Sequence, residues 1–151
     1  MNIIVNNDTI EEYLKKCGWY KGRKIDTFQF IKVLKNNGYI NIEDYIYQFY
    51  QEFYGLKGTT LKMNYPWKIL TEDDIIEYYG NYFEYSKFVE FMCHGSNLHY
   101  YVKEDYFPIC FVFLKDDILA YYITESNKIY CEDGIFMGNN PIDGLNKILI
   151  R

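Results

Sequence analysis

The chain has 151 residues, which suits one domain with one hydrophobic core, and we expect that domain to span residues 1–151. Asp and Glu number 21 against 16 Lys and Arg, a formal charge of -5 that argues against nucleic acid or an anionic membrane surface as a partner and permits a basic protein. Hydrophobic residues make up 49%, which argues against global disorder.

The first part of the chain is predicted to be helical. Thr9 and Glu12 have the spacing of a capping box, and Gly18 is placed to end that helix. The turn Gly18–Arg23 follows, and Asp26 can cap a second helix.

The second helix is expected to stop at Asn37 and Gly38. Asn41 can cap a third helix, which Gly55 ends. Residues Thr59–Tyr65 alternate in the manner of a strand, with Pro66 closing it.

The middle of the chain has one clear helix start. Thr71 can cap a helix whose first turn holds Glu72, Asp73 and Asp74, because carboxylates favour the positive end of the helix dipole. The segment 81–93 fits a helix or a strand. A further helix capped by Ser96 or Asn97 is favoured over a hairpin around Gly95.

The last third is predicted to be β structure followed by a helix. Ile109–Leu114 and Ile118–Thr124 are rich in β-branched and aromatic residues, with a turn at 115–117, and Lys128–Cys131 is a further strand. Asn140 and Pro141 begin a terminal helix as cap and first residue. This order predicts an α+β fold, with N-terminal helices packed on a mainly antiparallel sheet and a closing C-terminal helix.

Aromatic residues make up 21% of the chain, with 18 Tyr and 11 Phe. One core cannot easily bury so many phenols, because each buried hydroxyl needs a hydrogen-bond partner, so some should lie at the surface. Exposed Tyr is a preferred contact residue in protein interfaces. A coding bias toward Asn, Ile, Lys and Tyr explains the same composition.

Cysteine and histidine offer little chemistry. Cys93, His94 and His99 are close in sequence and Cys131 could approach them, but no short-spaced ligand pair exists, so we expect no metal site and no cofactor. No motif marks a catalytic nucleophile or a phosphate loop, and we expect no catalytic residue. An enzyme using Cys93 or His99 remains as an alternative. We also expect no secretory signal and no membrane span, hence reduced thiols in a cytoplasmic protein.

Three groups of acidic residues are candidate contacts with a basic partner, because an acidic surface speeds association by electrostatic steering. Solvated helix ends and turns are the alternative interpretation. The candidates are Glu72, Asp73, Asp74, Asp116, Asp117, Glu132 and Asp133.

The residues from Cys17 to Asp26 have the pattern GWxxGRxxD, and three later segments accompany it: Phe53–Leu56, Tyr106–Ile109 and Asn127–Tyr130. This order resembles the third subgroup of the SUKH superfamily of bacterial toxin-immunity proteins. Its members show a GWxxGR turn, a helix end similar to F-G-G-L, a strand with hydrophobic-P-hydrophobic-G and a strand with G-x-V-Y. Tyr54, Cys110 and Asn127 stand here where those patterns have glycine.

The resemblance implies a single SUKH-like immunity domain that binds and neutralises a cognate bacterial toxin, often a nuclease, by occluding it. It implies no catalytic residues. We expect the motif residues Gly18, Trp19, Gly22, Arg23 and Asp26 to be structural, with Trp19 anchored in the core and Arg23 paired with Asp26 or another acid. A general interaction or scaffold domain of the same fold is the rival hypothesis, because fold alone does not fix function. The oligomeric state is open.

Overall fold

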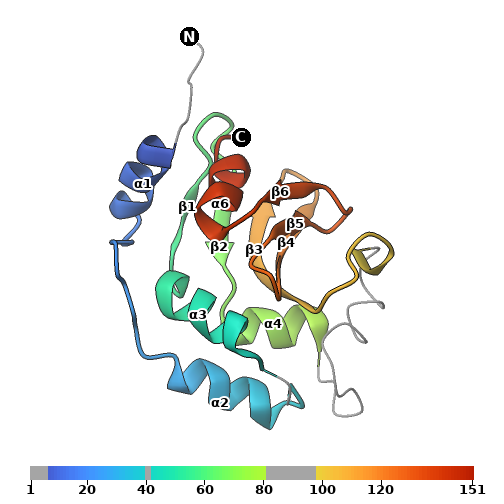
Figure 1. The fold of residues 1–151 in the computed structure, drawn as a ribbon. Helices are drawn as coiled ribbons and strands as arrows, with labels where there is room; N and C mark the ends of the chain where they lie inside the picture. Colours follow the sequence, from blue (N-terminus) through green and yellow to red (C-terminus); the bar gives the residue numbers. More distant parts are fainter. Residues whose placement is uncertain (1–6, 40–41, 81–97) are drawn as a thin grey trace.

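The computed structural model describes residues 7–39, 42–80 and 98–151 (Figure 1). Within these ranges it contains α-helices, one short 3-10 helix and a six-stranded sheet. The helices are α1 (Asn7–Lys16), α2 (Phe28–Asn36), α3 (Asp44–Phe53), α4 (Glu72–Tyr79), η1 (Leu98–Tyr100) and α6 (Pro141–Leu149). The strands are β1 (Lys57–Thr59), β2 (Pro66–Ile69), β3 (Tyr106–Phe113), β4 (Ile118–Thr124), β5 (Ile129–Cys131) and β6 (Phe136–Gly138).

The sheet is an antiparallel meander whose strands lie in chain order from β1 to β6. The longest pairing joins β3 and β4, from Tyr106 opposite Thr124 to Phe113 opposite Ile118, with a bulge between Pro108 and Cys110. The predicted α+β fold, with a mainly antiparallel sheet and a closing helix, is therefore confirmed.

One face of the sheet is covered by α1 and α6. The Trp67 indole N–H of β2 donates to the Tyr13 hydroxyl of α1 over 3.1 Å. Ile129 of β5 packs directly against Gly144 of α6, where an added Cβ would lie 2.4 Å from the Ile129 Cγ1. Glycine at this point lets the helix backbone approach the strand closely.

Helix α4 covers the opposite face of β3 and β4. Adjacent side chains on a strand point to opposite faces, so each strand can pack against a helix on either side. Tyr79 of α4 and Tyr122 of β4 share a hydrogen bond of 2.8 Å between their hydroxyls. The Tyr50 hydroxyl of α3 donates to the Pro108 carbonyl over 2.8 Å. Each of these buried phenols therefore has the hydrogen-bond partner that its burial requires.

The N-terminal helices occur where the sequence predicts them, but each starts differently from its predicted cap. Helix α1 begins at Asn7, so Thr9, the predicted cap, lies inside the helix. Asp26 accepts the Phe28 backbone N–H over 2.8 Å at the start of α2, although Thr27 is the residue in the cap position. The third helix begins at Asp44 with Glu43 as its cap, later than a cap at Asn41 predicts. Asn41 itself lies outside the described residues.

The predicted strand Thr59–Tyr65 is wrong. The chain turns there instead: the Thr60 N–H bonds the Tyr65 carbonyl, and Asn64 has a φ of 54°. The Thr60 hydroxyl accepts the Tyr65 N–H over 2.9 Å and closes the turn from the side chain. Pro66 begins β2, because proline is tolerated at the first residue of a strand.

In the second half, the sequence correctly predicts α4 with its Thr71 cap, β4, the turn before it, β5 and α6. Strand β3 also occurs, but it begins at Tyr106, three residues before the predicted start. The short strand β6 was not predicted. The described part of the helix expected after Asn97 is a single 3-10 turn, η1. The predictions for 81–93 and for a hairpin around Gly95 fall outside the described residues.

Two of the departures from the family pattern have a backbone explanation. Asn127 has a φ of 68°, in the left-handed region that Asn tolerates better than most residues, so it can replace glycine there. Tyr54 has a φ of −55°, which needs no glycine, whereas the next residue, Gly55, has a φ of 86°. In the helix-end motif this chain therefore keeps glycine at Gly55, the position where the backbone requires it.

Candidate functional site

The turn after α1 packs against the C-terminal end of α3. The Trp19 side chain is buried, 5% exposed, and its indole N–H donates to the Glu52 carboxylate over 3.0 Å. The Ile25 backbone N–H donates to the Gln51 carbonyl over 2.9 Å. Trp19 thus lies in the core while its polar edge has a partner, as a structural role requires.

Arg23 does not form an ion pair with Asp26. Its guanidinium donates to two backbone carbonyls instead, to Glu52 over 2.6 Å and to Tyr54 over 2.7 Å. These carbonyls belong to the last turn of α3, where backbone acceptors lack partners within the helix. The arginine therefore caps α3, and its charge complements the negative end of the helix dipole.

The three acids at the start of α4 are engaged within the protein to different degrees. Asp74 completes a capping box with Thr71, and its carboxylate lies 2.8 Å from the Lys68 ammonium. Burial works to raise the Asp74 pKa, but the bonds from Lys68 and Thr71 outweigh it and lower that pKa. Glu72 accepts the Tyr54 hydroxyl over 2.7 Å, and Asp73 is exposed.

The other two predicted clusters meet in space, and we call Asp116, Asp117, Glu132 and Asp133 the hairpin-end acids. The β3–β4 and β5–β6 turns lie at the same end of the sheet, because β5 runs antiparallel to β4 and the Glu132 N–H after it bonds the Ala120 carbonyl, toward the start of β4. Burial raises the Glu132 pKa, and the negative charges of Asp117 and Asp133 raise it further. Like charges from both turns therefore act on one carboxyl group.

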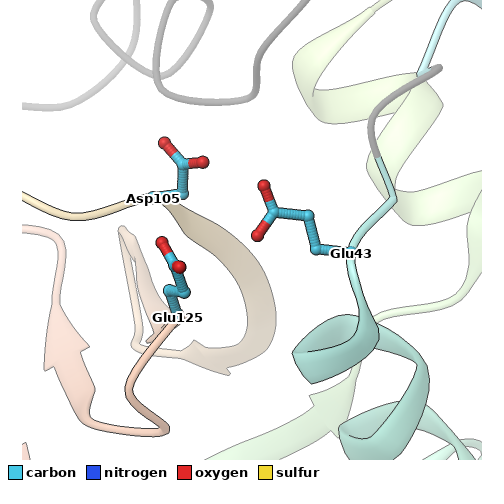
Figure 2. A group of neighbouring side chains, drawn as sticks. All are labelled: Glu43, Asp105 and Glu125. Atoms are coloured by element: carbon cyan, nitrogen blue, oxygen red, sulfur yellow. The ribbon is translucent and has the colours of Figure 1, made fainter.

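A further acidic group was missed by sequence reasoning. Figure 2 shows Glu43, Asp105 and Glu125, which we call the acidic trio, pointing toward one another from three segments. One carboxylate oxygen from each lies within 4.8 Å of the others. Asp105 precedes β3 and Glu125 follows β4, so the β3–β4 pairing brings them together. Sequence spacing gave no signal, because the residues come from distant positions.

The acidic trio concentrates negative charge beside a pocket of ≈ 550 Å³ lined by Glu43, Asp44, Tyr45, Gln48, Glu125 and Asn127. Burial raises the Glu43 pKa, followed by its hydrogen bond to Asp105 and by the charges of Asp105, Glu125 and Asp44. No Lys or Arg in the described ranges forms an ion pair with any member of the trio. Three carboxylates at this spacing can coordinate a divalent cation or accept a cationic side chain.

The described cysteines are free thiols: Cys17, Cys110 and Cys131. Burial raises the pKa of Cys110 strongly and that of Cys131 to about 11, so both are protonated at neutral pH and are poor nucleophiles. Cys93 and His94 lie outside the described residues, and the structure describes only the backbone of His99. None of the helices in the described ranges is long and apolar enough to cross a membrane.

Replacing Arg23 tests its capping role. Arg23→Met keeps much of the side-chain stem but leaves two carbonyls of α3 without their charged donor, and we expect a loss of about 2 kcal/mol in the free energy of unfolding. Arg23→Lys should recover only part, because an ammonium lacks the planar fork that reaches both oxygens. Urea unfolding measures the effect, with the exposed neighbour Lys24→Met as control. Equal stability of Arg23→Met and wild type would contradict the capping role.

The raised Glu43 pKa has a defined consequence for stability. Between the unfolded and folded pKa values the folded state binds more protons, so this group's contribution to the free energy of unfolding falls as pH rises. Glu43→Gln should therefore be more stable than wild type at pH 7, by roughly 0.3–1 kcal/mol at low salt. The difference should shrink as acidification protonates Glu43.

Thermal or urea unfolding across pH measures this difference, with Glu77→Gln, an exposed carboxylate on α4, as the control. Concentrated salt should also reduce the difference, because it screens the repulsion. A Glu43→Gln variant that is less stable than wild type at neutral pH would show that the carboxylate stabilises the fold.

Comparison with known proteins gives one match. A model of the SUKH-3 immunity protein family matches residues 6–150, which includes the GWxxGR turn, the sheet and the closing helix. No curated protein and no solved structure matches the chain. The resemblance predicted from the sequence motifs is confirmed. Because the match covers nearly the whole chain, this protein belongs to the SUKH-3 immunity protein family.

Proposed function

We propose that this chain binds a cognate bacterial toxin and neutralises it by occluding the toxin's active site, without catalysing a reaction itself. The observation that carries the proposal is the match to the SUKH-3 immunity protein family over residues 6–150. Neutralisation takes place, on this proposal, in the cytoplasm of the cell that makes the toxin.

The charge distribution supports a basic partner. The chain carries 21 Asp and Glu against 16 Lys and Arg, and Lys15–Glu12 and Lys68–Asp74 are the ion pairs in which both partners lie in the described ranges. The acidic trio and the hairpin-end acids hold like charges close together, and a cationic surface would relieve that repulsion. Nucleases bind phosphates through basic sites, so a nuclease toxin would complement these surfaces.

The first test is whether the tagged chain recovers one stoichiometric toxin domain from its own cells and protects a host that expresses that domain. We expect both, measured by mass spectrometry and by survival. A recovered toxin domain from which the chain gives no protection would contradict the immunity proposal.

Charge reversal tests which acidic cluster speeds association with the toxin domain. Reversing the hairpin-end acids should slow association with that toxin domain by roughly tenfold or more at low salt, because steering depends on opposite charges. A second variant reverses Glu72 and Asp73, leaves the capping Asp74 intact and measures the contribution of the start of α4 separately. Unchanged association and protection after reversal of all three predicted clusters would contradict the electrostatic part of the proposal.

A further inference from the structure

Exposed aromatic rings lie on the α4 side of the sheet. The Tyr78 side chain is 48% exposed, and its ring centroid lies 4.9 Å from that of Phe111 beneath it. On β5 and β6, the half-buried Tyr130 packs edge-to-face on Phe136, which is 42% exposed, with 5.4 Å between centroids. Tyr130 is paired with Tyr122, the residue that bonds Tyr79 of α4, so these rings share one face.

Carboxylates lie among these rings. Glu132 follows β5, and its backbone N–H donates to the Ala120 carbonyl over 3.0 Å while its carboxylate accepts the Ala120 N–H over 3.4 Å. Ala120 is paired with Phe111, the residue beneath Tyr78, so the Glu132 carboxylate lies close to these rings. The Tyr78 pKa is raised, by burial first and then by the charges of Glu132 and Asp117. Asp117 accepts the Ile118 N–H through one oxygen and forms no ion pair with any described residue.

We propose that this tyrosine–acid face, made of Tyr78, Tyr130, Phe136, Asp117 and Glu132, is the surface that docks the basic partner and that it favours arginine. A guanidinium can lie flat on an aromatic ring while it donates to a carboxylate, which an ammonium does less well. The rings are held by ring contacts beneath or beside them, so little side-chain entropy is lost on binding. The identity of that partner as the toxin rests on the proposed function above.

Other surfaces fit a basic partner less well. At the start of α4, Asp74 is already bonded to Lys68 and Thr71. At the acidic trio the neighbouring Tyr45 is buried, 6% exposed, and offers no ring face to a partner. Phe28 is exposed, but Lys32 and Lys35 share its pocket. A second copy of the chain would bring Asp117 and Glu132 against their own like charges.

The test uses the full chain, labelled with nitrogen-15, and two probes, deca-arginine and deca-lysine, followed by amide chemical shifts. We expect the largest shifts around residues 78, 117, 130, 132 and 136, and binding of deca-arginine roughly three- to fivefold tighter than that of deca-lysine. Phe136→Ala and Asp117→Asn should each weaken deca-arginine binding roughly threefold, because each removes one part of the site.

Matched controls are Phe28→Ala, another exposed phenylalanine, and Asp73→Asn, another exposed aspartate, and neither should change the affinity. Shifts centred on the acidic trio, equal losses in the controls, equal affinity for the two peptides, or no binding would each overturn the inference. The toxin does not enter this test. Failure here would leave the immunity proposal standing, and failure of the protection assay would leave the peptide map standing.

Discussion

Burial of the β3–β4 pair on both faces is the constraint on which the rest of the structure depends. Every residue of β3 except the last is buried, and so are the last five residues of β4. Helix α6 lies on one face of the sheet, with α1 beside it over β1 and β2, and α3 and α4 lie on the other, so the two central strands expose little side-chain surface (Figure 1). Strands β3 and β4 therefore hold no charged residue, and acids occur where these strands end or turn, because burying an unpaired charge is costly. Both acidic surfaces, the trio and the hairpin-end acids, lie at such ends.

The family's most specific motif serves this architecture. Arg23 satisfies two carbonyls of α3, and Trp19 is buried beside Glu52, so the GWxxGR turn fixes α1 and α3 relative to each other. Residues engaged in this way have little capacity left for a partner. The motif is thus informative about the fold, whereas the side chains that can contact a partner lie at other positions.

Local signals predicted most of the elements. Thr71 before three acids and Asn140 with Pro141 are cap patterns that depend on neighbouring residues alone, and both caps occur as predicted. The strand at 59–65 failed because alternation of apolar and polar residues does not report a turn. There the turn is held by the Thr60 hydroxyl and by bonds from the backbone of 61–63 to the C-terminal residues.

Contacts between residues that are distant in the sequence could not be predicted from it. The hairpin-end acids were predicted as two clusters, and only the strand order brings Asp117 to Glu132. The acidic trio combines three distant positions, so no spacing rule could find it. Arg23 was expected to pair with an acid, because side-chain charge is visible in a sequence, whereas the unpaired carbonyls at the end of α3 are not.

Because crowded carboxylates change their protonation when a cation binds, proton release on binding can identify the contact surface. The pKa values of Glu43 in the trio and of Glu132 among the hairpin-end acids are both raised, so at a given acidic pH each is more protonated than an ordinary glutamate. A cation brought against either group lowers its pKa and releases the proton. Calorimetry of toxin binding in buffers of different ionisation enthalpy should therefore detect proton release. If the partner docks on the tyrosine–acid face, Glu132→Gln should abolish this release and Glu43→Gln should leave it unchanged. The reverse pattern would place the partner on the trio, and proton uptake would contradict a cationic contact at both surfaces.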